Sequence, residues 1–341
     1  MTTATRWTDT DVSAISRDRP IRIAVVTNMW PHEVRPTFGV FVRDQVRSLQ
    51  ALPGVEVEVF PLQPIEQRSR YLRGGEISRT IIRAGFDIVH CHHPFALAAL
   101  APYPVVRRRP VILTIHGIEG TEGWRRHLTS SVARLADAVV VTNAELHRRY
   151  GGHLIPCGVD PGRFAREGAH RSAGDPVVVL TVGEDRPEKQ FWLARQAVAW
   201  AASSKSMAGI QPVAFHHRFV TGVHPDDMPE VYRKADILVL SSRAEGSPMV
   251  IQEALASRLR VVSTDVGDIR LLEGSDRGVY VAARQTVESL GAALADALRD
   301  ESEGRSFVTS FVRQEDTASR LVELYRLIAG NRGRVKFRAT R

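Results

Sequence analysis

The chain has 341 residues, of which 43% are apolar and 25% charged, an ordinary composition for a globular protein. This length predicts two domains of about 150 residues each, and no run of 18 apolar residues indicates a membrane span. The net charge of +8 is spread along the chain, so it favours anionic partners such as phosphorylated small molecules, lipid headgroups or nucleic acid without choosing among them.

The start of the chain predicts no structure. Residues 1–20 mix Thr, Ser, Asp and Arg without an apolar stretch, so we expect a disordered lead-in, no secretory signal and a cytoplasmic protein. Cys91 and Cys157 are the only cysteines, and neither belongs to a CxxC pair, so both are expected to be small buried residues. The basic stretches 107–110 and 330–341 lack interleaved aromatics, which favours solvated surfaces over a nucleic-acid site.

The first half of the chain alternates short apolar runs with amphipathic stretches. Helices are predicted between the strands at 39–50, 78–85, 95–103, 123–135 and 144–151. The predicted strands are 21–27, 55–62, 86–90, 110–117, 137–143 and 153–160. Six parallel strands with helical crossovers describe one doubly wound, Rossmann-like domain over residues 21–160.

The alternation restarts after a stretch without periodicity at 161–175, which we interpret as a linker. A second domain of the same α/β kind is predicted over 176–312, followed by a closing helix at 313–329 and a basic tail at 330–341. Its strands are predicted at 176–183, 212–222, 236–243, 260–267 and 278–282, and its helices at 191–203, 228–235 and 248–257. Two such domains direct the carboxyl ends of both strand sets toward a central cleft.

The stretch EGSPMVIQEALA, residues 245–256, places two acids around a helix start. Glu245 follows a strand, Ser247 is a plausible N-cap, and Pro248 suits the first helical position. The unpaired N–H groups of the first turn would form an anion site suited to a diphosphate. Glu253 lies one turn further on, where its carboxylate could accept both hydroxyls of a ribose, and Glu245 would meet a second polyol. The alternative is a surface helix with two solvated glutamates, which spacing alone does not exclude.

The stretch ADILVLSSRAEGSPMVIQEALASRLRVVSTDVGD closely resembles the acid-seven-acid signature of the retaining family 4 glycosyltransferases, whose fold, GT-B, consists of two Rossmann-like domains. NMWPHEVRPTFGVFVRDQV, FDIVHCHHPFA, VILTIHG, LIPCGVDPGRF and TGVHPDDMPEVYRKADI resemble other segments of that family in the same order. The resemblance covers residues 21–328, and this collinearity makes it specific.

The resemblance implies a nucleoside-diphosphate sugar as donor substrate, held mainly by the second domain, with no cofactor. It implies that Glu253 binds the ribose, Glu245 the transferred sugar, and His116 a position near that sugar. Gly39 would let the first domain's backbone approach the phosphate. Base contacts would come from backbone around Gly222 and Val223. The backbone expected to line the sugar and diphosphate is that of Gly246, Ser247, Pro248, Met249 and Val250.

One departure from the family pattern concerns the diphosphate. The family usually has Gly-Arg a few residues before a Lys, and here the sequence is VGEDRPEKQ, with Glu184 in the arginine's place and Lys189 matching the lysine. Arg186 is a plausible substitute, because a guanidinium can bind phosphate from a shifted backbone position. Without such a substitute, donor binding and catalysis would both be weakened.

The resemblance implies transfer with retention of configuration and no metal ion. Cations and a helix N-terminus can stabilise the leaving diphosphate without one. The single Asp-x-Asp, Asp9 and Asp11, falls in the lead-in. A metal site at His90, Cys91, His92 and His93 is disfavoured, because neighbours on an extended segment point to opposite faces. His216 and His217 stand where the family is apolar, and the sequence offers no account of them.

Other functions remain open. A protein of this fold that binds a nucleotide sugar without transferring it is compatible with Glu184. A nucleotide-sugar epimerase shares the architecture but not the acid pair, and a nucleic-acid binder would need stacking motifs that the sequence lacks. The resemblance favours a glycan or lipid-linked acceptor, with a small natural product as the alternative. Peripheral association with an anionic membrane through Arg68, Arg70, Arg73 and Arg79 and a solvated basic surface are equally compatible with the sequence.

Overall fold

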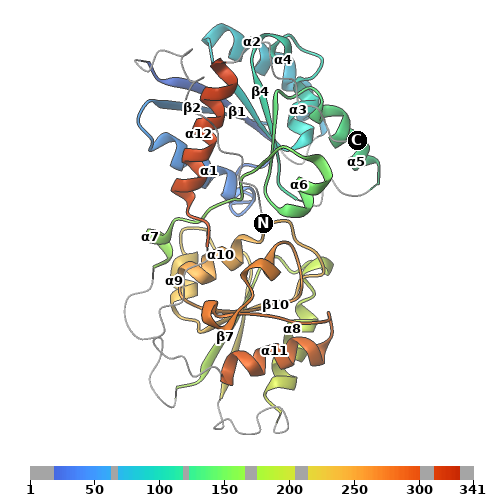
Figure 1. Ribbon diagram of the computed structural model, residues 1–341, viewed down its shortest axis with the longest axis vertical. Helices are drawn as coiled ribbons and strands as arrows, with labels where there is room; N and C mark the ends of the chain where they lie inside the picture. The colour runs from blue at the N-terminus through green and yellow to red at the C-terminus, as the bar shows by residue number, and fades with distance from the viewer. Residues whose placement is uncertain are drawn as a thin grey trace, which may run out of the picture.

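The computed structural model describes residues 19–62, 68–117, 123–165, 175–203, 214–299 and 311–330. Two parallel sheets with helices on both faces form two domains, one above the other along the long axis of the molecule (Figure 1). The expectation of an α/β fold with two doubly wound domains is confirmed. The predicted lead-in up to residue 18 and the tail from residue 331 lie outside the described residues, whereas Arg19 is held by an ion pair with Asp87 at 2.7 Å.

The first sheet has the strand order β2-β1-β3-β4-β5-β6, and all its pairs are parallel. The central strands β3 and β4 are buried along their whole length, as expected for apolar runs covered on both faces. The strands are β1 (Ile21–Thr27), β2 (Val55–Pro61), β3 (Ile88–His92), β4 (Val111–Ile115), β5 (Ala138–Val141) and β6 (His153–Leu154).

Helices cover both faces of the first sheet. One face packs Cys91 and Leu113 against α2, α3 and α5, and the other packs Ile88 and Ile112 against α1 and α12. The helices of this part of the chain are η1 (a 3₁₀ turn, Arg68–Arg73), α1 (Val40–Gln50), α2 (Gly74–Ala84), α3 (Pro94–Leu100), α4 (Val105–Arg108), α5 (Gly123–Ala133) and α6 (Ala144–Tyr150).

The second sheet has the strand order β11-β10-β9-β7-β8, again with parallel pairing. One of its faces is covered by α9 and α10 and the other by α8 and α11. The strands are β7 (Val177–Val182), β8 (Phe215–Val220), β9 (Ile237–Leu240), β10 (Arg260–Ser263) and β11 (Val279–Val281). The helices are α8 (Phe191–Ala201), α9 (Met228–Arg233), α10 (Met249–Ala256) and α11 (Val287–Arg299), with 3₁₀ turns η3 (Pro187–Lys189), η4 (Ile269–Leu272) and η5 (Ser275–Arg277).

Several elements differ from the sequence-based expectations, and helix α4 and the 3₁₀ turns are among those not predicted. Helix α11 was not predicted, although Leu290, Leu294 and Ala297 recur at helical spacing and are buried against α8. Strand β6 is only two residues long. The predicted linker begins with a short helix, α7 (Pro161–Phe164), whose first turn is capped by the carboxylate of Asp160.

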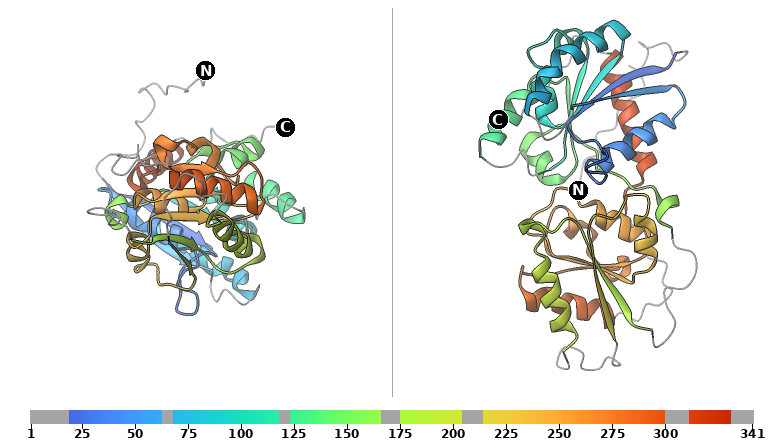
Figure 2. Two further views of the ribbon diagram at one scale, coloured as in Figure 1. Left: turned by 90° about the horizontal axis from the view of Figure 1, so that it is seen from below. Right: turned by 180° about the vertical axis from the view of Figure 1, so that it is seen from behind.

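The chain's last helix returns to the first domain. Helix α12 (Gln314–Gly330) lies beside α1, and the right-hand view of Figure 2 shows it from behind. Its residues Leu321 and Tyr325 are fully buried in that domain's core. The two segments that cross between the domains pair with each other, since Val159 bonds to Val312 and Gln314 through backbone groups. Within the described residues, no helix is long and apolar enough to cross a membrane.

Candidate functional site

The loop between β9 and α10 carries the first acid of the pair. Helix α10 begins at Met249 with Pro248 as its N-cap, so the predicted N-cap role of Ser247 is wrong. No side chain caps this helix. The N–H of Ile251 bonds to the carbonyl of Pro248 at 3.1 Å, so the N–H groups of Met249 and Val250, which precede this first bond, are the ones suited to an anion. The anion site predicted around Met249 and Val250 thus stays a prediction with favourable local geometry.

Glu245 and Lys189 are brought together from separate loops. One carboxylate oxygen of Glu245 accepts hydrogen bonds from Lys189 Nζ and Ser242 Oγ, each at 2.6 Å. Both charged side chains are about one-sixth exposed, at 15% and 16%, so the pair is sheltered but reachable. Lys189 ends η3, just after β7, and its side chain passes over Gly183, where an added Cβ would lie 3.5 Å from Cε.

Glu253 lies inside α10 and is fixed by a tyrosine. The buried hydroxyl of Tyr232, on α9, donates to Glu253 Oε2 at 2.7 Å. Burial raises the pKa of Glu253, the hydrogen bond from Tyr232 lowers it, and the charge of Asp44 from the first domain raises it. The pKa of Tyr232 is also well above its ordinary value, through burial and the neighbouring carboxylate. The carboxylate is therefore positioned by one donor and keeps acceptor capacity for a ligand.

The structure places the two proposed phosphate cations differently. Lys189 points to Glu245, whereas the side chain of Arg186 is 59% exposed and lies 3.4 Å from Glu184. Arg35, in the loop after β1 of the first domain, reaches the same Glu184 at 3.7 Å. The glutamate that departs from the family pattern is therefore compensated by two guanidiniums, one from each domain.

Two glycines expected near the ligand adopt left-handed conformations. Gly39 precedes α1 with φ +73°, and an added Cβ would lie 2.4 Å from the backbone carbon of Met29. Only glycine therefore allows this loop to fold back against the residues after β1. Gly222, with φ +68°, and Val223 lie in the loop between β8 and α9, at the carboxyl edge of the second sheet. That loop is tied to α7, because Arg163 donates to the carbonyl of Pro225 at 3.2 Å.

His116 follows β4 and meets the second domain through its backbone. An added Cβ on Gly246 would lie 2.6 Å from the carbonyl oxygen of His116, so the two loops are in close contact. The imidazole turns inward: His116 Nε2 and His92 Nδ1 share a hydrogen bond of 2.9 Å. Burial, then the neighbouring His92, holds the pKa of His116 well below its ordinary value, so the ring is neutral at pH 7.

The histidines around β3 are hydrogen-bonded within the core. His90 bonds to Tyr325 Oη and Thr114 Oγ1, each at 2.6 Å, and its ring lies 4.1 Å from that of His92. Cys91 points into the opposite core. Among the described residues, no group of three or more His, Cys, Asp or Glu side chains could hold a metal ion.

His217 also has a partner. Its Nε2 bonds to Thr181 Oγ1 at 3.0 Å, and burial lowers its pKa to about 4. His216 is exposed on β8, an edge strand, which accounts for a polar residue at this position.

A second contact between the domains lies at the start of α6. Asn143 caps α6 through its side-chain oxygen and donates from Nδ2 to the carbonyl of Gly246 at 2.9 Å. Asp268 of the second domain accepts from the N–H of Ala144 at 2.9 Å. These contacts fix the Glu245 loop against the carboxyl edge of the first sheet.

Sequence reasoning missed several residues of this arrangement. Asn143 could have been found, because an Asn directly after a strand and before a helix is an N-cap signal. Tyr232 and Arg35 carry no such local signal, since each meets its partner only in the folded chain. Ser242 is only three residues from its partner Glu245, at the end of the strand predicted over 236–243.

Two family profiles match the chain. The profile of Glycosyltransferase Family 4 matches residues 17–163, and that of Glycosyl transferases group 1 matches residues 170–300. The sequence is 23% identical to the TuaC glycosyltransferase of Bacillus subtilis, whose name refers to teichuronic acid biosynthesis, over 82% of this chain and 88% of that protein. It is 29% identical to a D-inositol 3-phosphate glycosyltransferase of Geodermatophilus obscurus over 45% of each chain.

Solved structures share the architecture. Sucrose-phosphate synthase from Thermosynechococcus elongatus superposes with a TM-score of 0.67 at 18% identity, over 90% of this chain and 98% of that one. HepE of Anabaena, in complex with UDP and glucose, superposes with a TM-score of 0.59 at 15% identity, over 91% and 98% of the two chains. At these identities the likeness concerns the fold.

Proposed function

The chain belongs to the family 4 glycosyltransferases of group 1 and has their GT-B fold, and from this premise we propose that it transfers a sugar from a nucleoside-diphosphate sugar to a glycan or lipid-linked acceptor. In this proposal transfer proceeds with retention of configuration and without a metal ion. The observation that carries the proposal is the joint placement of Lys189, Glu245 and the uncapped start of α10 one turn before Glu253.

In this proposal, different residues bind different parts of the donor. Glu253, oriented by Tyr232, accepts the ribose hydroxyls, and Glu245 accepts hydroxyls of the transferred sugar. The first-turn N–H groups of α10 and the Nζ of Lys189 meet the diphosphate. Lys189 has three N–H donors, so it can keep its bond to Glu245 while contacting a phosphate oxygen.

The chemical step builds negative charge on the leaving diphosphate. Lys189 and the positive end of α10 stabilise that charge in a fixed geometry, which needs no reorganisation during the reaction. Among the described residues we identify no separate nucleophile. The leaving phosphate itself therefore takes the proton from the acceptor hydroxyl as the new glycosidic bond forms on the same face.

The neighbours support the choice of donor and acceptor classes. The HepE complex contains UDP and glucose, which makes UDP-sugars the first donors to test. The TuaC name refers to the synthesis of a cell-wall polymer, which favours a glycan over a small natural product as acceptor.

The test has two stages. A thermal-shift panel of UDP, GDP, ADP and TDP with their sugars identifies the donor, because a ligand at 100 times its dissociation constant adds about 2.7 kcal/mol of stability. Transfer of radiolabelled sugar from that donor to lysate glycans then measures activity. The Glu253→Ala variant should lose the shift, and an unchanged shift in that variant contradicts the proposed site.

One observation favours a second candidate, a protein that binds a nucleotide sugar without transferring it. The family arginine is replaced by Glu184, and Arg186 points outward to pair with it. Intact donor binding with no transfer and no release of nucleoside diphosphate would support this function over catalysis.

A further inference from the structure

A group of aromatic side chains at the carboxyl edge of the first sheet is not used by the donor site. Tyr71, His93, Phe95 and Trp124, here called the aromatic platform, lie in a chain of ring contacts at 5.9, 5.1 and 5.8 Å, with Phe95 in the middle. Trp124 is 65% exposed, although tryptophan is usually well buried. Trp124 is the exposed end of the group, Tyr71 and Phe95 are half-buried and His93 is buried, so the platform offers one open ring on a fixed aromatic base.

The aromatic platform is adjacent to the proposed donor site. His93 directly follows His92, whose ring bonds to His116, and the backbone of His116 touches Gly246. On its other side, the hydroxyl of Tyr71 accepts from Nδ2 of Asn28, which directly follows β1. The platform therefore extends from the edge at which the first domain meets the Glu245 loop.

The backbone at His93 is held in an unusual conformation. Its φ of 96° is in a region that non-glycine residues rarely adopt, because it costs conformational energy. The side chain offsets this cost: His93 Nδ1 accepts from the N–H of Phe95 and caps α3, and its ring stacks on that of Phe95. Strain held in place by local contacts is common at binding sites. Here it fixes the orientation of the central ring of the platform.

The rim of the aromatic platform is positively charged. The guanidinium of Arg70 lies 4.8 Å from the ring centre of Tyr71, and that of Arg125 lies 5.9 Å from that of Trp124. Burial first, and then the charges of Arg125 and Arg70, lower the pKa of His93 to about 4. An apolar surface with a cationic rim suits a sugar ring that carries a carboxylate or phosphate, because its C–H face can stack while its charge is paired.

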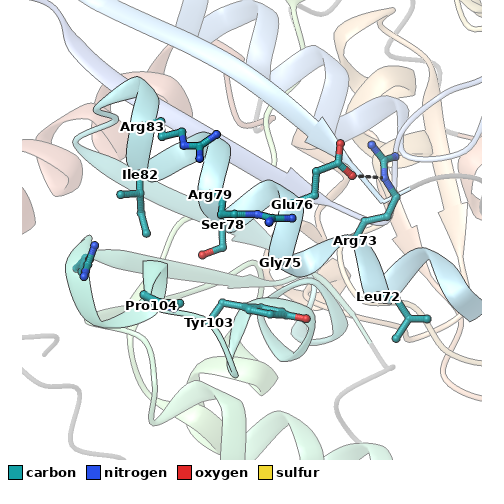
Figure 3. A pocket seen from close by; sticks show the side chains of 11 residues that line it. Leu72, Arg73, Gly75, Glu76, Ser78, Arg79, Ile82, Arg83, Tyr103 and Pro104 are labelled. Atoms are coloured by element: carbon teal, nitrogen blue, oxygen red, sulfur yellow. Dashed lines mark hydrogen bonds and ion pairs between the residues drawn. The ribbon is translucent and has the colours of Figure 1, made fainter.

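A cavity of about 790 Å³ is lined by residues that directly follow Tyr71 of the aromatic platform in the chain. Leu72 and Arg73, the residues after Tyr71, belong to its lining, and Figure 3 shows Arg79 and the ring of Tyr103 facing the same space. Four arginines and one glutamate line the cavity: Arg73, Arg79, Arg83, Arg108 and Glu76. Glu76 is paired with Arg73 at 3.3 Å, so the remaining lining charge is positive. This volume is in the range of natural ligand pockets.

We propose that the first domain binds an acidic glycan as the acceptor, with its terminal sugar on the aromatic platform and preceding charged residues in the arginine-lined cavity. This inference rests on the proposed transfer reaction and names the acceptor class. A chain of anionic sugars is favoured over a bilayer, because arginines of η1, α2 and α4 line a concave volume that a single polymer chain can enter and a flat membrane surface cannot.

The experiment uses the full chain and two oligosaccharide probes, an oligogalacturonate and its fully methyl-esterified, uncharged form. Binding of each is measured by calorimetry with the wild-type protein and two variants, Trp124→Ala and the double variant Arg79→Ser/Arg83→Ser. The matched control is Arg134→Ser/Arg148→Ser, which removes the same charge from exposed positions of the same domain outside the cavity.

The wild-type protein should bind the charged probe more tightly than the neutral one. The Arg79/Arg83 variant should lose roughly tenfold or more in affinity for the charged probe only. Trp124→Ala should weaken both probes about tenfold, because it removes a stacking surface. The control should bind as wild type, and all variants should keep the nucleotide thermal shift, which also shows that they are folded.

Equal wild-type affinity for the two probes, or full binding by the Arg79/Arg83 variant, overturns the inference. The inference is also overturned if the Arg79/Arg83 variant still binds the charged oligosaccharide but no longer pellets with vesicles of anionic phosphatidylglycerol. That result would assign these arginines to membrane binding. The nucleotide panel separates this inference from the donor assignment. If the oligosaccharides do not bind as predicted while a nucleotide still raises the melting temperature, only this inference is wrong. If the charged oligosaccharide binds as predicted but no nucleotide raises the melting temperature, only the proposed donor site is wrong.

Discussion

The two facing sides of the molecule are built in different ways. In the second domain, Ser242, Glu245 and Glu253 come from one short stretch, and only Lys189 and Tyr232 join from elsewhere. In the first domain, the residues that face the second domain come one or two at a time from the ends of separate strands. In the proposed function, a local motif therefore carries the binding of the donor, whereas the surface proposed for the acceptor is assembled by the fold.

The largest expected effect tests the charged centre of the second domain. Replacing Lys189 by Met removes the cation beside the proposed diphosphate, and we expect release of nucleoside diphosphate from the donor sugar to slow by about 100-fold or more. The lone Glu245 carboxylate would also be destabilising, so Glu245→Gln/Lys189→Met is the control for folding. A single variant within threefold of the wild-type rate would remove Lys189 from the mechanism.

A second variant addresses the ribose contact. Glu253→Gln keeps the shape and the contact with Tyr232 but removes the charge, and we expect donor affinity to fall roughly 10- to 100-fold, because hydrogen bonds to charged groups are the strong ones. Titration calorimetry with the nucleotide from the thermal-shift panel measures it. An unchanged dissociation constant would mean that the motif does not carry the binding.

The pH dependence of donor binding sharpens the role of Tyr232. Glu253 must be ionised to accept ribose hydroxyls, so binding should weaken as the pH falls through its raised pKa. The hydrogen bond from Tyr232 lowers that pKa, so Tyr232→Phe should move this acidic limb to higher pH. Phe164→Leu removes the ring beside Tyr232 and leaves its hydroxyl in place, so that variant should be less stable without moving the limb. If donor binding weakens at the same pH in Tyr232→Phe and in the wild type, Tyr232 contributes to packing alone.

A smaller effect, on stability, is expected at the contact between the two domains. Asn143→Ala removes the cap of α6 and the bond to Gly246, and we expect a loss of about 1 kcal/mol of stability from the cap alone. Asn143→Ser keeps a capping side chain but is too short to make the second bond, so it should recover most of the melting temperature. Equal melting temperatures of the alanine variant and the wild type would show that this contact is not stabilising.

The smallest effect concerns the glutamate that departs from the family pattern. Glu184→Ala frees Arg35 and Arg186 from their exposed ion pairs, which contribute little to stability. We expect donor affinity to rise by about threefold or less, because the charge near the diphosphate becomes more positive. A fall in affinity, measured with the same nucleotide, would show that Glu184 holds these guanidiniums in place for the ligand.

Much of the fold could be predicted from the sequence, because strands buried on both faces are nearly continuous runs of Val, Ile and Leu. Helix α11 was missed, and the packing of α12 on the first domain had no local signal. The acid pair was visible as a motif with a helix start between its members. The contact of Tyr232 with Glu253 was not, because a buried tyrosine hydroxyl shows no partner until α9 and α10 are packed together. The same limit hid the aromatic platform, whose members come from η1, the start of α3 and the start of α5.

The return of α12 to the first domain has a consequence for how the protein is made. Until this helix is added, the face of the first sheet that carries His90 and Ile112 is covered by α1 but lacks the side chains of Tyr325 and its neighbours on α12. During synthesis the ribosome releases the whole second domain before it releases this helix. The first domain is therefore the first to be synthesised and the last to be completed. A nascent chain stalled before residue 314 would present the incomplete core of this domain to chaperones.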